Sequence, residues 1–171
     1  NPAGGSWRTP SNWSLGRVPT ALDSVVIDLN GTYTVNLDTT ITAAFIAVGG
    51  SSGTQTLSLA SRTLTITGQL RTQGTGALVF SGATLAGAGS LVNTATASLF
   101  NTTISTAGVN SGTLNGNATV TLTGALTTTA SSLLRARSDN SSGFVNFTVA
   151  TGFTNLGALE LTNAGNAYPA T

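Results

Sequence analysis

The chain has 171 residues, of which 40% are hydrophobic and only 6% are charged, and its formal net charge is +1. An average soluble domain carries about 25% charged residues, so hydroxyl and amide side chains must cover most of this surface. All six basic residues are arginines spread along the sequence, which argues against a basic nucleic-acid-binding patch. The absence of histidine and cysteine excludes disulfides, thiolate chemistry and the usual zinc sites. No apolar run approaches the roughly 18 residues of a membrane-spanning helix, so we expect no membrane insertion.

Residues 1–24 differ in composition from everything that follows. They contain both tryptophans, Trp7 and Trp13, and three of the four prolines. A stack of coils exposes its first coil and a strand edge, and a loop-rich segment with two large aromatic side chains is suited to cover them. We therefore interpret 1–24 as an amino-terminal cap in which the two indoles pack. The alternative is that Trp7, Trp13 or the nearby Tyr33 forms a stacking surface for sugar rings.

Two short segments with alternating apolar residues follow the cap. They span 25–29 and 33–37 and are joined by Asn30-Gly31, which is a strong turn signal. This dipeptide suits a two-residue hairpin, or a sharp corner between two faces of one coil. We favour the corner, because the following segments keep a similar spacing.

A repeat with a fixed period of 21 positions covers 53–136. Cut at that interval, the sequence aligns Leu57, Leu78, Leu99 and Val120 in one phase. The other phases align Leu59 with Phe80 and Leu122, Leu64 with Leu85, and Leu70 with Leu91 and Leu133. Within each block, apolar residues alternate with Thr, Ser or Ala, which is the period of a strand with one buried face. A period of about 20–30 residues built from short strands is typical of stacked solenoids.

Residues 25–171 are therefore predicted to form an all-β, parallel β-helix or β-solenoid, with roughly 21 residues per coil and three short faces. The length and the apolar content suit one structural domain. Successive strands on a face lie about 4.8 Å apart, so roughly eight coils give a rod on the order of 35–40 Å long. Gly, Ser, Asn and Thr mark the corners.

The last third of the chain keeps the repeat less strictly. Ile104, Val109 and Leu114 follow one another at intervals of five, so at least one corner must shift in that coil. The register is lost at 138–143, where we predict a loop, and new strands begin beyond it. Residues 157–162 are predicted to form a strand with Leu159 and Leu161 facing inward. Because no cap is recognisable before residue 171, we expect that more coils follow or that the last residues fold over the end.

Both ends of the chain carry motifs of one kind of protein. The amino-terminal motif is a Trp, a short gap, Asn-Trp, a Gly, Val-Pro, an Asp and a Val/Ile strand. It falls on Trp7, Asn12, Trp13, Gly16, Val18, Pro19, Asp23, Val25, Val26 and Ile27. The carboxyl-terminal motif falls on Asn155, Gly157, Leu159, Glu160 and Leu161. These segments resemble secreted bacterial β-solenoid surface proteins, such as autotransporter-like passengers with β-strand repeats. The resemblance implies a solenoid that is extracellular or on the bacterial cell surface. It specifies no activity, because such solenoids serve as stalks, adhesins and scaffolds.

Acidic residues offer little material for catalysis or metal binding. There are five, namely Asp23, Asp28, Asp38, Asp139 and Glu160, and none of them lies within the repeat at 53–136. Asp28 and Asp38 lie close in sequence and have the potential to approach across a coil as a paired-carboxylate or calcium site. We favour the alternative of solvated aspartates at strand ends or turns, and we expect no cofactor.

Threonine rows are the strongest non-catalytic feature. The stretches 63–67, 119–123 and 127–129 place hydroxyls at alternate, outward-facing strand positions. Flat threonine ladders on a solenoid resemble the ice-binding surface of some antifreeze proteins. One repeat further on, however, Thr65 and Thr67 are followed by Ala86 and Ala88, which argues against a regular array.

The favoured hypothesis is a non-enzymatic, extracellular structural module of a surface, fibre or adhesin protein. It would serve as a rigid spacer or scaffold whose partners are copies of itself or neighbouring coils. The alternatives are a carbohydrate-binding module that recognises surface glycans and, with less support, an ice-binding protein or a polysaccharide-degrading enzyme.

Overall fold

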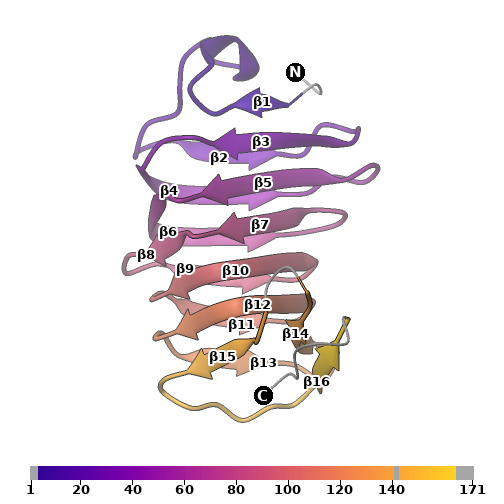
Figure 1. The fold of residues 1–171 in the computed structure, drawn as a ribbon. Helices are drawn as coiled ribbons and strands as arrows, with labels where there is room; N and C mark the ends of the chain where they lie inside the picture. Colours follow the sequence, from indigo (N-terminus) through magenta and orange to yellow (C-terminus); the bar gives the residue numbers. More distant parts are fainter. Residues whose placement is uncertain (1–3, 141–142, 165–171) are drawn as a thin grey trace.

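The protein is a parallel β-solenoid of about seven stacked coils with roughly 21 residues per turn (Figure 1). The computed structural model describes residues 4–140 and 143–164. The strand pairs between coils are all parallel among the described residues. This confirms the fold class that the alternation and the repeat predict.

Each coil has three faces, and strands of successive coils stack on each face. The first face contains β1 (Gly5–Ser6), β3 (Tyr33–Leu37), β5 (Gln55–Ala60), β7 (Ala77–Ser81), the first parts of β10 (Thr96–Ile104) and β12 (Thr113–Leu122), β14 (Leu133–Ser138) and β16 (Ala158–Asn163). The second face contains the first parts of β4 (Ile41–Val48) and β6 (Thr63–Thr72), then β8 (Thr84–Ala86), the last parts of β10 and β12, and β15 (Asn146–Val149). The third face contains β2 (Ser24–Ile27), the last parts of β4 and β6, then β9 (Ser90–Asn93), β11 (Ala107–Asn110) and β13 (Leu126–Thr128).

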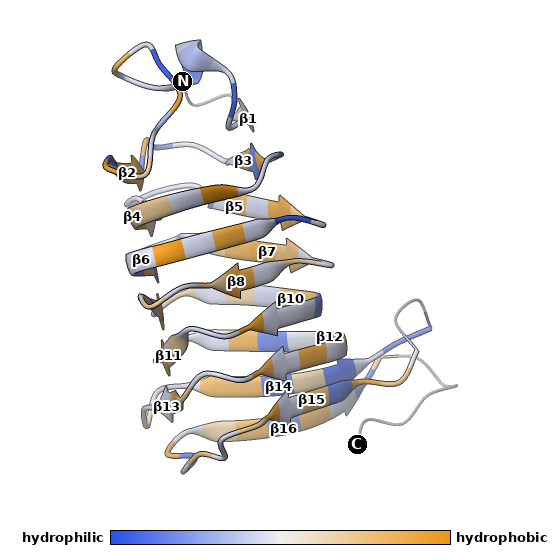
Figure 2. Ribbon diagram, turned by 90° about the vertical axis from the view of Figure 1, so that its left-hand side faces the viewer, coloured by the Kyte–Doolittle hydropathy of each residue, from blue (hydrophilic) through white to orange (hydrophobic). Residues whose placement is uncertain are grey.

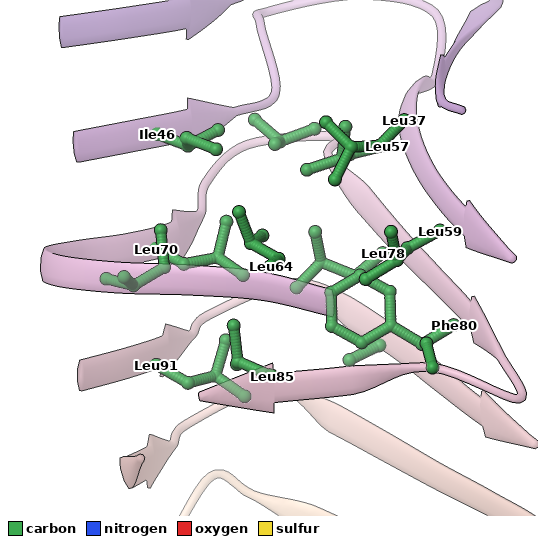
Figure 3. Packing of buried hydrophobic residues seen from close by; sticks show 14 of the residues in the cluster. Leu37, Ile46, Leu57, Leu59, Leu64, Leu70, Leu78, Phe80, Leu85 and Leu91 are labelled. Carbon is green, nitrogen blue, oxygen red and sulfur yellow. The ribbon is translucent and has the colours of Figure 1, made fainter. Parts of the chain in front are cut away.

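The interior is filled by apolar side chains that stack on their counterparts in the next coil. Leu64 pairs in register with Leu85, and Leu70 pairs with Leu91. Figure 3 shows these leucines as layers beside Phe80. Alternate residues of each strand point inward, so the intervening threonines and serines face solvent. Each leucine is therefore buried both within its own coil and against the coils above and below.

The coil length is not constant, and this corrects the alignment at a fixed period. Leu57 pairs with Leu78 as expected, but Leu78 then pairs with Ala97, which comes two positions earlier than the expected Leu99. Leu99 accordingly stacks on Phe80 and not on Leu78. A slip of two positions keeps every side chain on the same side of a strand. The fixed period therefore still places apolar residues inward while assigning them to the wrong partner.

Three further positions of the fixed alignment are also wrong. Val120 pairs with Thr102 and Leu122 pairs with Ile104, both on the second face, whereas the phases of Leu57 and Leu59 belong to the first face. Leu133 shares a phase with Leu70 in the alignment, yet it pairs with Thr113 on the first face and points outward. Its neighbour Leu134 is the inward residue there.

The predicted corner at Asn30-Gly31 is confirmed, and other corners depend on unusual backbone conformations. The flanking strands β2 and β3 pair with β4 and β5, not with each other, so the dipeptide forms a corner and no hairpin. Gly49 has φ +122°, and a Cβ there would collide with the carbonyl oxygen of Gln73. Glycine is therefore required where consecutive coils approach at this corner.

The two ends of the stack differ. Trp7 is 1% exposed and belongs to the core cluster. At the other end, β16 pairs with β14 so that Leu159 and Leu161 continue the inward columns of Leu134 and Ala136. Their exposed fractions are 56% and 58%, because no described coil lies beyond them. The expectation that the last residues fold over this end concerns 165–171, which lie outside the described residues, as do residues 141–142 of the expected loop.

Candidate functional site

A hollow lies between the amino-terminal segment and the first coil. Its volume is about 490 Å³. Its walls come from the loop around η1 (Pro10–Asn12) and from strands β2 and β3. The side chains relevant to ligand binding there are Trp13, Arg17, Asp23, Asp28 and Tyr33. This cavity forms because the chain crosses from β1 to β2 without making a second-face strand over the interior (Figure 1).

The two tryptophans of the predicted stacking surface pack on each other. Their ring centroids lie 4.7 Å apart with an interplanar angle of 65°, an edge-to-face arrangement. The indole N–H of Trp13 donates a hydrogen bond of 2.8 Å to the Trp7 carbonyl oxygen. Trp7 itself is anchored by its backbone N–H, which donates to the carbonyl of Asn36 at 2.8 Å. Buried in this way, Trp7 has no ring face open to a sugar, whereas the half-buried Trp13 lines the cavity.

Tyr33 lines the same cavity from the first coil. It begins β3 and is buried within the core cluster. Burial raises the pKa of its hydroxyl, and the nearby Asp28 acts in the same direction. The hydroxyl is therefore neutral over the physiological range, which leaves it able to donate and to accept hydrogen bonds.

An ion pair stands on the rim of the cavity. The two terminal guanidinium nitrogens of Arg17 donate hydrogen bonds to the Asp23 carboxylate, at 2.7 and 2.8 Å. The backbone N–H and the hydroxyl of Thr20 also donate to Asp23, at 2.6 and 2.8 Å. These donors hold the pKa of Asp23 well below its usual range. The pair closes the turn that leads into β2 and so fixes the rim.

Asp28 and Asp38 do not come together. Asp28 follows β2 at the corner between the third and first faces, whereas Asp38 follows β3 at the corner between the first and second faces. Asp38 accepts a hydrogen bond of 2.6 Å from the Ser6 hydroxyl. No group of three or more His, Cys, Asp or Glu side chains suited to a metal ion occurs within residues 4–140 and 143–164.

A buried polar ladder, which the sequence patterns did not reveal, runs along the third face. The inward column that begins with Ile27 and Val48 continues as Thr72, Asn93, Asn110 and Thr128, all about 1% exposed. The Thr72 hydroxyl donates to the Asn93 side-chain oxygen, and the Asn93 amide donates to the Asn110 side-chain oxygen, both at 2.8 Å. The sequence signal is a polar residue two positions after an inward residue in each of β6, β9, β11 and β13. Thr128 therefore faces inward, which corrects the expectation that all hydroxyls of 127–129 face outward.

Gln55 is a second buried polar group that the sequence patterns did not predict. Its side chain is fully buried beside the corner that holds Gly50. The amide nitrogen donates to the carbonyls of Gly31 and Ser52, at 2.6 and 2.9 Å, and the amide oxygen accepts from the Gly50 N–H at 2.6 Å. Gln55 thus supplies the partners that corner backbone groups lack.

Arg135 and Arg137, the closest pair of basic residues, have different surroundings. Arg135 forms an ion pair of 2.7 Å with Glu160 in the next coil. Arg137 is exposed. They face outward at alternate positions of β14, which pairs with β12 on one side and with β16 on the other.

Comparison with family models, with curated proteins and with solved structures finds no match to this chain. None of the helical segments described here has the length and apolar character to cross a bilayer.

Proposed function

We propose that this chain is a non-enzymatic structural module of an extracellular or cell-surface protein, acting as a rigid spacer that associates through its open end. The parallel ladders (Figure 1) and the core cluster of apolar side chains along the stack support the stiffness of such a module. The resemblance of the two terminal motifs to secreted bacterial solenoid proteins supports the location. A surface of hydroxyls and amides with few charges suits the same class of fibre and adhesin proteins.

The observation that carries the proposal is the end formed by β16, which no other strand of residues 4–140 and 143–164 covers. Leu159 and Leu161 occupy columns that are buried in the preceding coils, yet more than half of each side chain is exposed. Leu156, beside the same end, is 62% exposed. Exposed apolar surface next to an unpaired strand edge is a template for pairing with another chain. The occupant we propose is the equivalent end of a second copy of this chain.

Sedimentation velocity over a range of protein concentrations tests this association. We expect the wild type to shift to larger species with concentration, and a Leu159→Ser/Leu161→Ser double variant to remain monomeric. The matched control is Leu22→Ser, since Leu22 is also highly exposed but lies in the amino-terminal segment. This control should associate like the wild type. A wild type that stays monomeric at every concentration contradicts the association.

A second candidate function is carbohydrate binding in the cavity of about 490 Å³. What favours it is the combination of an aromatic wall from Trp13 and Tyr33 with the polar rim of Arg17 and Asp23. A glycan array tests it, with Trp13→Ala as the variant. Weaker glycan binding with an unchanged melting temperature supports this candidate. A variant that only loses stability, or a wild type that binds no glycan, counts against it.

A further inference from the structure

The outward side of the second face carries one column of threonines and a second column that contains both hydroxyl residues and alanines. Strand pairing places one threonine from each of six successive coils in the first column. Each of these threonines pairs in register with the next one, except that the first two are related by the registered pair one position further along. The column is Thr40, Thr63, Thr84, Thr103, Thr121 and Thr148. The second column, two positions further along each strand, is Thr42, Thr65, Ala86, Ser105, Thr123 and Ala150. Figure 2 shows the strands β4, β6 and β8 of this face toward the viewer.

The fixed period of the sequence conceals this array. Thr63 pairs with Thr84 at the full repeat interval, but the next two steps of the column, to Thr103 and then to Thr121, are shorter. One full repeat beyond Thr84 lies Ser105 instead. The alanine that argued against a threonine lattice in the sequence is still present on the folded surface, since Ala86 pairs with Thr65 in the second column. On the folded surface the first column is unbroken.

Most hydroxyls of the array have no partner within the protein. Among the described residues of the array, the side chains that donate no hydrogen bond and accept none are those of Thr42, Thr63, Thr65, Thr84, Thr103, Thr121 and Thr123. In the buried ladder, by contrast, the hydroxyls of Thr72 and Thr128 are hydrogen-bonded. The array therefore presents hydroxyl groups that are available to hydrogen-bond to a ligand or to solvent. Because threonine is β-branched and stiff at χ1, these hydroxyls and methyls hold their spacing with little loss of entropy on binding.

The second face differs chemically from the other two. Its two outward columns contain no charged residue and no large apolar or aromatic side chain. The first face carries Arg135 and Glu160, and the third face carries Arg71 over the ring of Phe45. Protein interfaces depend on apolar or aromatic anchors, and a sugar requires an aromatic platform. Neither is present in these columns, so their chemistry suits a partner that is itself a lattice of hydrogen-bonding groups.

We propose that the second face binds the surface of ice. The spacing of the array is set by the solenoid, at about 4.8 Å between coils and about 6.6 Å between alternate residues of a strand. The spacing between coils is close to the shorter repeat of the oxygen atoms on the prism surface of hexagonal ice, and the spacing along the strand is somewhat below the longer repeat. The hydroxyls hydrogen-bond to lattice water, and the methyls between them order the water that joins the two surfaces. This activity goes beyond the structural role proposed above and does not depend on association through β16.

The test measures ice partitioning and thermal hysteresis of the purified chain. The variant is Thr103→Tyr, which places a bulky ring in the middle of the array, and the control is Thr96→Tyr. Thr96 lies on the same strand, β10, and is also exposed, but it faces outward on the first face. We expect the wild type and the control to enter growing ice and shape the crystals, and Thr103→Tyr to lose most of both effects at an unchanged melting temperature.

A second variant covers the case in which Thr103→Tyr does not fold. Thr121→Val removes one hydroxyl at nearly constant volume and should weaken thermal hysteresis, with Thr113→Val as its first-face control. A wild type that neither enters ice nor shapes it overturns the proposal, as does an equal loss in variants of both faces. Oligomers that dissociate on Thr103→Tyr also overturn it, because the face would then bind protein. The monomeric Leu159→Ser/Leu161→Ser variant should retain ice binding, which separates this proposal from the structural one.

Discussion

The amino-terminal and carboxyl-terminal coils use the same ladders around different interiors. In the first coils, the inward column of the third face is apolar, with Ile27 and Val48. From Thr72 onward the same column is polar and hydrogen-bonded from coil to coil. The backbone pairing does not change across this boundary. A solenoid interior therefore tolerates polar side chains where stacking supplies each with a partner from the next coil.

The two ends extend this contrast. The amino-terminal end buries an indole beneath a loop, and the carboxyl-terminal end leaves leucines of the inward columns open to solvent. Burial therefore differs among residues that occupy equivalent columns. Substitutions at these positions show whether the loss in the free energy of unfolding depends on the burial of a side chain or on its position in a column.

Trp7→Ala is expected to produce the largest loss. Removing a fully buried aromatic side chain costs about 3–5 kcal/mol of the free energy of unfolding. Denaturant unfolding followed by circular dichroism measures this loss. The control is Leu22→Ala in the same amino-terminal segment, where the side chain is 93% exposed and the change should stay within about 0.5 kcal/mol. Equal effects of the two substitutions would show that the amino-terminal segment does not stabilise the stack.

Leu57→Ala and Leu159→Ala compare two inward positions of the first face. Leu57 is fully buried, whereas Leu159 lies at the open end. We expect a loss of about 2–5 kcal/mol at Leu57, because a cavity remains, and less than about 1 kcal/mol at Leu159. The measurement is denaturant unfolding of dilute, monomeric protein. A large loss at Leu159 under those conditions would mean that another part of the chain covers it.

Asn93→Ala tests the polar ladder. It leaves Thr72 and Asn110 without their side-chain partner and frees the Thr113 carbonyl, which accepts from the Asn93 amide at 2.9 Å. Each orphaned buried group costs about 1–3 kcal/mol, so we expect the free energy of unfolding to fall by at least about 3 kcal/mol, as measured by thermal or denaturant unfolding. Asn115→Ala is the matched control, since Asn115 faces outward on the first face. If both variants lose the same stability, the ladder contributes nothing beyond an ordinary surface amide.

Asp23→Asn is expected to have the smallest effect, and its size depends on pH. The folded state lowers the pKa of Asp23 below its unfolded value of 3.8. The stabilisation by Arg17 and Thr20 is therefore complete above that value and is lost as the pH falls below it. The variant should melt slightly below the wild type at neutral pH, and the gap should shrink as the pH falls from about 4 toward 2. If the difference in melting temperature stays the same at acidic pH, it arises from hydrogen bonds that the asparagine variant loses and not from the charge of Asp23.

Local patterns in the sequence were sufficient for the fold class and for the direction of most side chains. Alternation along each strand identified Leu57, Leu64 and Leu70 as inward residues, and Asn30-Gly31 was correctly interpreted as a corner. The position of the tryptophans was sufficient to mark the amino-terminal segment as different. The cavity beside Trp13 was not foreseen, because its walls come from strands and loops whose approach depends on how the chain enters the first coil.

For most strands, which residues face inward follows from the amino-acid sequence alone, because the two-residue period of a strand is a property of neighbouring residues. Leu133 and Thr128 are exceptions. Which coil positions stack on one another is a property of the tertiary structure, since that register depends on the length of each corner. The corners vary in length. The sequence interval between the paired residues Thr84 and Thr103 therefore differs from that between Asn93 and Asn110, and no single period predicts both pairs. The threonine array and the buried polar ladder both arise from this inter-coil register, and both became visible only with the strands paired.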